Sequence, residues 1–124
     1  MPLSHRVQLS VFPLGSSEPQ RALAAIRATW VNPAWVASRE INGAWLLEAA
    51  MEAPLAVDDE HDDSVEAAFT KRLSMAIWRK LGRYVRVVVD AGAEESEESC
   101  HHELGRSDYL MLMRVGEAPP ASNA

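Results

Sequence analysis

The chain contains a single cysteine, no long apolar run and fewer basic than acidic residues. With Cys100 alone, an intrachain disulfide is excluded. No apolar run approaches the roughly 18 residues of a membrane-spanning helix. The N-terminal residues also lack the charged and apolar regions of a signal peptide, so we expect no membrane association and a cytoplasmic location. A net charge of −6, from 12 Lys and Arg against 18 Asp and Glu, opposes direct binding to nucleic acid.

The sequence also lacks the short motifs of several common chemistries. It has no Gly-x-Ser-x-Gly elbow, phosphate-binding loop, Gly-x-Gly-x-x-Gly fingerprint or His-Glu-x-x-His zinc motif. The RNP1 pattern of RNA-binding domains is absent as well. We therefore expect a protein that is not an enzyme and has no cofactor. A small enzyme is kept as the last of three hypotheses, without a nucleophile–base pair to support it.

What the chain does contain is the composition of a folded domain. Of its 124 residues 48% are hydrophobic, which is too apolar for general disorder. This length suits one hydrophobic core. We expect a single α+β domain over residues 1–116 and a disordered C-terminal tail over residues 117–124.

The first elements follow from apolar alternation and turn residues. Alternating apolar side chains predict a strand over residues 6–12, which Pro13 ends. Ser17 and Gln20 fit a capping box at the start of a helix of about three turns.

A hairpin is predicted next. Asn42 and Gly43 separate two apolar segments, and Asn-Gly is the favoured pair for a type I′ turn. Residues 44–52 also have high helix propensity. We favour a strand there because the turn chemistry is specific.

The second half begins with the longest periodic pattern. An i, i+4 apolar stripe from Val65 to Leu81 predicts a helix. We expect Asp63 as its N-cap, Glu66 as the reciprocal acid and Gly82 just after its end.

Two further apolar segments, residues 84–89 and 109–115, are predicted to be strands. The order is then β-α-β-β-α-β plus one extra C-terminal strand. This is the ferredoxin-like split βαβ pattern, an antiparallel sheet with two helices on one face. The last strand would be apolar on both faces, which indicates either an interior place in the sheet or a covered surface. A covered surface would mean homodimerisation through that strand or the sheet face.

This topology makes the third and fourth strands parallel, so the segments that follow them leave from the same end of the sheet. Those segments are the acidic runs at residues 58–63 and 94–103, which hold ten of the 18 acids. Basic residues gather instead on and just after the second helix: Lys71, Arg72, Arg79, Lys80, Arg83 and Arg86.

The leading hypothesis is a small acidic interaction protein, of the inhibitor, antagonist or immunity type that phages and mobile elements encode. Its acidic end would dock on a basic, nucleic-acid-binding surface of a partner protein. Trp35, at a loop–strand junction, is the expected exposed anchor. The predicted partner-binding residues are Asp58, Asp59, Glu60, Asp62, Asp63, Glu94, Glu95, Glu97, Glu98 and Trp35.

The alternative is a dimeric ferredoxin-like regulatory domain that binds a small molecule or a metal. Cys100, His101 and His102 are zinc-ligand types, and His61 could supply a ligand from a second segment. Adjacent residues rarely converge on one tetrahedral ion, so these four are weak metal candidates. We expect the segment at residues 94–103 to be a solvated acidic connection instead.

Overall fold

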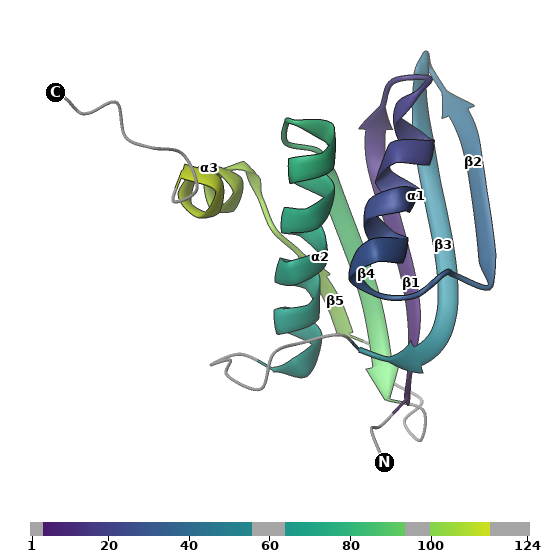
Figure 1. The fold of residues 1–124 in the computed structure, drawn as a ribbon, viewed down its shortest axis with the longest axis vertical. Helices are drawn as coiled ribbons and strands as arrows, with labels where there is room; N and C mark the ends of the chain where they lie inside the picture. Colours follow the sequence, from purple (N-terminus) through teal and green to yellow (C-terminus); the bar gives the residue numbers. More distant parts are fainter. Residues whose placement is uncertain (1–3, 56–63, 94–99, 115–124) are drawn as a thin grey trace, which may run out of the picture.

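The computed structural model describes residues 4–55, 64–93 and 100–114 (Figure 1). The fold is α+β, with a five-stranded antiparallel sheet and three helices among these residues. In chain order the elements are β1 (Ser4–Leu14), α1 (Glu18–Thr29), β2 (Trp35–Ile41), β3 (Ala44–Pro54), α2 (Val65–Leu81), β4 (Arg86–Ala93), β5 (Cys100–Glu103) and α3 (Arg106–Arg114).

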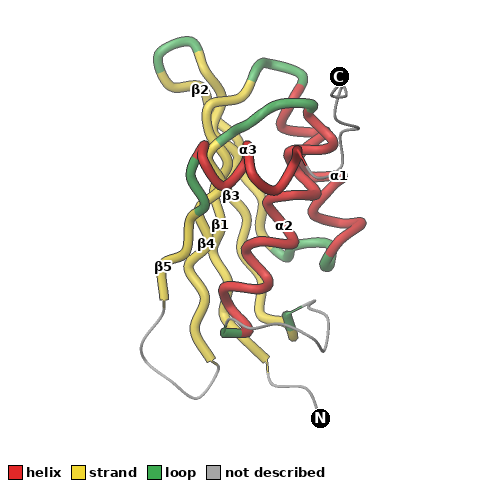
Figure 2. Tube along the Cα trace, turned by 90° about the vertical axis from the view of Figure 1, so that its left-hand side faces the viewer, coloured by secondary structure: helices red, strands yellow, loops and turns green. Residues whose placement is uncertain are grey.

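The sheet order is β2-β3-β1-β4-β5, and every neighbouring pair of strands is antiparallel. Helices α1 and α2 lie on one face of the sheet (Figure 2). Odd-numbered residues of β1 and β4, such as Val7 and Val87, are buried on that face against Phe69 and Ile77 of α2. We call the opposite face the open face, because no helix of the described chain covers it. No helix in the described ranges is long and apolar enough to cross a membrane.

The predicted hairpin is confirmed. Asn42 and Gly43 have φ angles of 52° and 85°, the two positive values that a type I′ turn needs. The segment after the turn is strand β3, which pairs with both β1 and β2. Two ladders of backbone hydrogen bonds therefore outweigh the helix propensity of this segment.

The predicted helix caps are partly wrong. The Ser17 side chain makes no capping hydrogen bond. Instead, the Glu18 carboxylate accepts a hydrogen bond from the Gly15 N–H at 2.8 Å. The N-cap of α2 is Ser64 rather than Asp63, and its hydroxyl accepts from the Ala67 N–H at 3.1 Å. A serine one residue closer to the helix has the extended backbone that an N-cap requires.

The predicted strand over residues 109–115 is also wrong, because residues 109–114 belong to helix α3 and residue 115 lies outside the described ranges. Leucine and methionine are good helix formers, and the segment lacks the polar–apolar alternation of a half-buried strand. Asp108 accepts a hydrogen bond from the Gly105 N–H at 2.9 Å at the helix start. Tyr109 packs edge-on against Trp78, with ring centroids 5.2 Å apart. The fifth strand is β5, which lies in the segment expected to be a loop; residues 117–124 fall outside the described ranges.

Candidate functional site

The ends of β3 and β4 meet at one end of the sheet. His5 of β1 lies opposite Ala53 of β3 and opposite Ala93 of β4, so these two strands run parallel to each other. Helix α2 begins at the same end (Figure 1). There His5 Nε2 and Glu66 Oε2 are 3.1 Å apart. The chain therefore leaves β3 for residues 56–63, and leaves β4 for residues 94–99, from a shared end.

Nine of the ten predicted partner-binding residues lie outside the described residues. They are Asp58, Asp59, Glu60, Asp62, Asp63, Glu94, Glu95, Glu97 and Glu98. The tenth acid counted with them, Glu103, is not in the connecting segment. It lies in β5 opposite Val88, and its carboxylate accepts hydrogen bonds from Arg86, one of them 3.1 Å long. The hydrogen bonds from Arg86 are the main reason that the pKa of Glu103 is lowered. The two segments that leave the shared end therefore hold nine acids, not the ten that were counted with Glu103.

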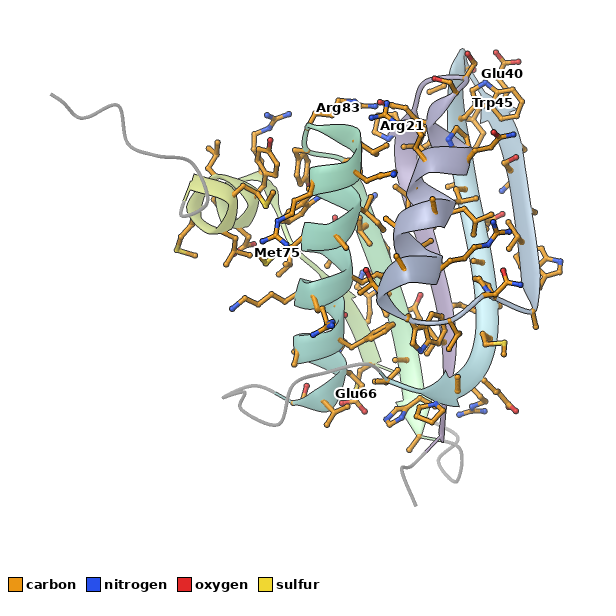
Figure 3. The ribbon with its side chains drawn as sticks, in the orientation of Figure 1. Arg21, Glu40, Trp45, Glu66, Met75 and Arg83 are labelled. Carbon is orange, nitrogen blue, oxygen red and sulfur yellow. The ribbon has the colours of Figure 1, made fainter. Side chains whose placement is uncertain are left out.

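The predicted basic side of the molecule is partly neutralised by the protein's own acids. Arg83 pairs with Glu18, and Arg86 pairs with Glu103. The α2 side chains Lys71, Arg72, Arg79 and Lys80 are exposed as well. Figure 3 places Arg21 and Arg83 at one end of the helical layer and Glu66 at the other.

The described weak metal candidates do not converge on one point. Successive side chains of a strand alternate between faces, so His101 shares the open face with Asp90 while Cys100 and His102 point to the other side. Cys100 is a free, exposed thiol. Within the described residues no three His, Cys, Asp or Glu side chains are grouped to hold a metal ion, and His61 lies outside them.

His101 instead belongs to a polar cluster on the open face. Its Nδ1 is 3.2 Å from Asp90 Oδ1, and its Nε2 is 3.7 Å from Glu103 Oε1. The ring is more than half exposed. Its described partners are carboxylates, which orient an imidazole but are not activated hydroxyl or thiol nucleophiles.

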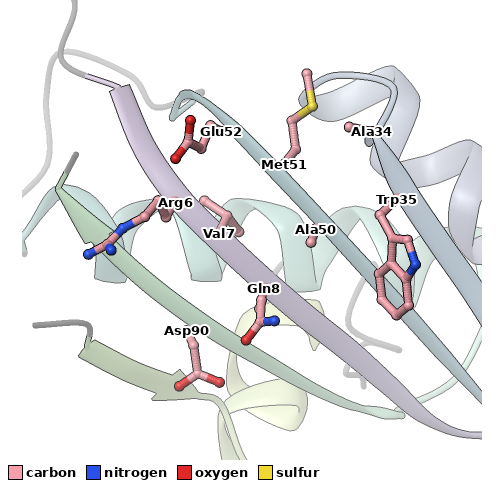
Figure 4. A pocket seen from close by; sticks show the side chains of 9 residues that line it. All are labelled: Arg6, Val7, Gln8, Ala34, Trp35, Ala50, Met51, Glu52 and Asp90. Carbon is pink, nitrogen blue, oxygen red and sulfur yellow. The ribbon is translucent and has the colours of Figure 1, made fainter. Parts of the chain in front are cut away.

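A shallow hollow of about 520 Å³ adjoins this cluster on the open face (Figure 4). Its lining includes Trp35 of β2, Ala50 of β3, Gln8 of β1 and Asp90 of β4. Together with His101 of β5, these residues lie opposite one another across the whole sheet and form a row, which we call the Trp35 row. The side chain of Trp35 is 52% exposed, so its predicted exposure is confirmed.

Sequence reasoning did not identify the Trp35 row. The only signal was the alternation of polar and apolar residues in the first strand, which places Gln8 away from the core. The register that aligns Gln8 with Trp35 and Asp90 depends on pairings between distant segments. Comparisons of the chain with protein-family models, curated proteins and solved structures found no match.

Proposed function

We propose that the protein is a non-enzymatic interaction protein, of the inhibitor or antagonist type, that docks its acidic end on a basic surface of a partner protein. The observation that carries this proposal is the position of His5 between Ala53 and Ala93. Because β3 and β4 flank β1 and end at the same end of the sheet, the two acidic segments that follow them start from that end. Negative charge gathered in one region steers association with a basic partner and favours that partner over others.

The pairing of the basic side chains supports the same proposal. Arg83 and Arg86 are engaged with Glu18 and Glu103, which lie away from the shared end. These arginines are therefore not placed to neutralise the acids of residues 58–63. A basic, nucleic-acid-binding surface on another protein is the kind of partner whose charge would complement them.

We also propose that the sheet and its two covering helices are a ferredoxin-like arrangement to which β5 and α3 are added. The order β2-β3-β1-β4 and the placement of α1 and α2 on one face support this. A fold of this kind hosts many unrelated functions, so the functional proposal rests on charge placement rather than on the fold.

The test is capture of partners from the native host with the tagged full-length chain, followed by mass spectrometry, at low and at high salt. We expect a stoichiometric protein partner that is lost at high salt, because screening weakens attraction between exposed charges. The variant Asp58→Asn/Asp59→Asn/Asp62→Asn/Asp63→Asn should lose this partner while its circular dichroism spectrum stays unchanged.

A matched control separates local charge from net charge. The variant Glu40→Lys/Glu117→Lys changes the net charge by the same amount, but Glu40 lies near the hairpin, far from the shared end (Figure 3). It should retain the partner. If the quadruple variant binds the partner with unchanged affinity, the proposed function is wrong.

A further inference from the structure

The open face of the sheet is a surface that the proposed function does not use. It consists of the side chains that alternate with the core residues along each strand. These are Arg6, Gln8, Ser10 and Phe12 of β1, Trp35, Ala37, Arg39 and Ile41 of β2, Leu46, Glu48, Ala50 and Glu52 of β3, Arg86, Val88, Asp90 and Gly92 of β4, and His101 and Glu103 of β5.

The apolar side chains of this surface reach across four strands. Trp35 is 52% exposed, and Phe12, Ile41, Leu46 and Val88 are half-buried. Beside Trp35 lies the hollow of about 520 Å³, which leaves room for side chains of a packed partner (Figure 4). We propose that two copies of the chain pack open face against open face and form a homodimer.

Charge is the first reason to choose a second copy as the occupant. The open face carries Arg6, Arg39 and Arg86 together with Glu48, Glu52, Asp90 and Glu103, a near balance. Nine of the 18 acids of the chain lie in residues 58–63 and 94–98, so a pairing of two acidic ends would bring like charges together. A balanced face can meet itself with less repulsion.

Area is the second reason. The five strands contain 11, 7, 11, 8 and 4 residues. At ~3.3 Å per residue and ~4.8 Å between strands, this gives a flat face of about 650 Å². Two such faces bury about 1,300 Å² in total, which exceeds the ~1,000 Å² that a specific interface needs.

The Trp35 row indicates how the two copies of the proposed homodimer are arranged. Gln8 lies in its middle on the central strand β1, while Trp35 and His101 lie at its two ends. A two-fold axis that runs along β1 places Trp35 of one copy over Asp90 and His101 of the other. The indole N–H can then donate to the Asp90 carboxylate, and the Gln8 amide, both donor and acceptor, can pair with its own copy.

The experiment is a mass measurement of the full chain in solution by light scattering and by sedimentation equilibrium, over micromolar to millimolar concentrations. We expect a reversible species of twice the 13.7 kDa chain mass. The variant Trp35→Asp should raise the dimer dissociation constant by about thirtyfold or more, the change expected for an aromatic anchor worth ~2 kcal/mol. A wild-type chain that stays monomeric at every concentration overturns the proposal.

Leu110→Asp on α3 is the matched control, because Leu110 is 50% exposed and receives the same charge. It should dimerise like the wild type. Dissociation by Leu110→Asp but not by Trp35→Asp would assign the interface to α3 and overturn the proposal. If Trp35→Asp unfolds, as judged by circular dichroism, Gln8→Arg is the second variant, since it places two positive charges together at the axis. The mass measurement needs no partner protein, so its result does not depend on whether the proposed function is correct.

Discussion

Glu18 at the start of α1 and Arg83 after the end of α2 form an ion pair across 65 residues of sequence. Arg83 Nε donates to Glu18 Oε2 at 3.2 Å, and Arg83 Nη2 donates to the Pro13 carbonyl at 3.0 Å. The Glu18 carboxylate also accepts from the Gly15 N–H. The Arg83 side chain thus connects the loop after α2 to the end of β1 and to the start of α1.

The Glu18 contacts should make stability depend on pH. The Arg83 hydrogen bond is the main reason that the pKa of Glu18 is lowered from its usual value of 4.5, with help from Gly15. A lowered carboxyl pKa contributes stability above pH 4.5 that is lost as the pH falls through the folded-state pKa. Glu18→Gln should therefore reduce the free energy of unfolding by roughly 1–2 kcal/mol at pH 7, and by less under acidic conditions. Urea unfolding at pH 7 and in acid measures this, with Glu40→Gln as the exposed control; an equal loss at both pH values contradicts it.

Trp78 joins the core to the start of β4. Its ring is 1% exposed, and its Nε1 donates to the Val85 carbonyl at 2.8 Å. Trp78→Phe leaves that buried carbonyl without its partner and opens a cavity, so unfolding should become easier by about 2–4 kcal/mol. Thermal or urea unfolding tests this against Trp45→Phe, which alters a half-buried ring and should have a smaller effect.

A methyl group added at Gly43 of the hairpin turn should destabilise the protein through backbone strain and not through a steric clash. Gly43 has φ 85°, and a Cβ added there would meet no atom within 4 Å. Gly43→Ala should thus lower the free energy of unfolding by about 1 kcal/mol through left-handed strain. Gly105→Ala is the control, because Gly105 has no positive φ and its added Cβ would have only an ordinary contact at 3.9 Å. Similar stability losses in both variants would contradict this explanation.

Zinc should leave the thermal stability unchanged. Strand alternation directs Cys100 and His102 away from the side that holds His101. An ion bound only by the folded state would stabilise it by RT ln(1 + c/Kd), where c is the ion concentration, and so raise the melting temperature as c exceeds Kd. Titration of Zn²⁺ into chelator-stripped protein, followed by thermal unfolding, tests this. A stoichiometric rise that Cys100→Ser abolishes would restore the metal hypothesis.

Local chemistry explains the features that sequence analysis found. The Asn42-Gly43 turn needs two positive φ angles, and few residues other than Asn and Gly adopt them. The apolar stripe of α2 likewise requires only helical spacing, and Phe69, Leu73 and Ile77 of that stripe are fully buried. Such signals lie within a few residues of sequence and do not depend on the rest of the molecule.

The C-terminal part shows where this reasoning fails. The run from Tyr109 to Met113 is apolar without a clear period, so periodicity does not separate a strand from a helix there, although its Leu and Met residues are good helix formers. The edge of β4 decides the outcome, because it pairs with Cys100–Glu103 and the next segment packs Tyr109 against Trp78. Which of the two segments becomes the fifth strand depends on which one pairs with the edge of β4.

The sequence by itself determined the hairpin, the two long helices, the strands of the central sheet and an excess of nine acids in two short segments. Only the tertiary structure decided that β5 forms from an acidic stretch and that Glu103 pairs with Arg86. It alone aligned Trp35, Gln8 and Asp90 in one row. The physical reason is that a strand's edge and register are fixed by hydrogen bonds to distant segments, whereas turns and helical stripes are fixed by their own residues.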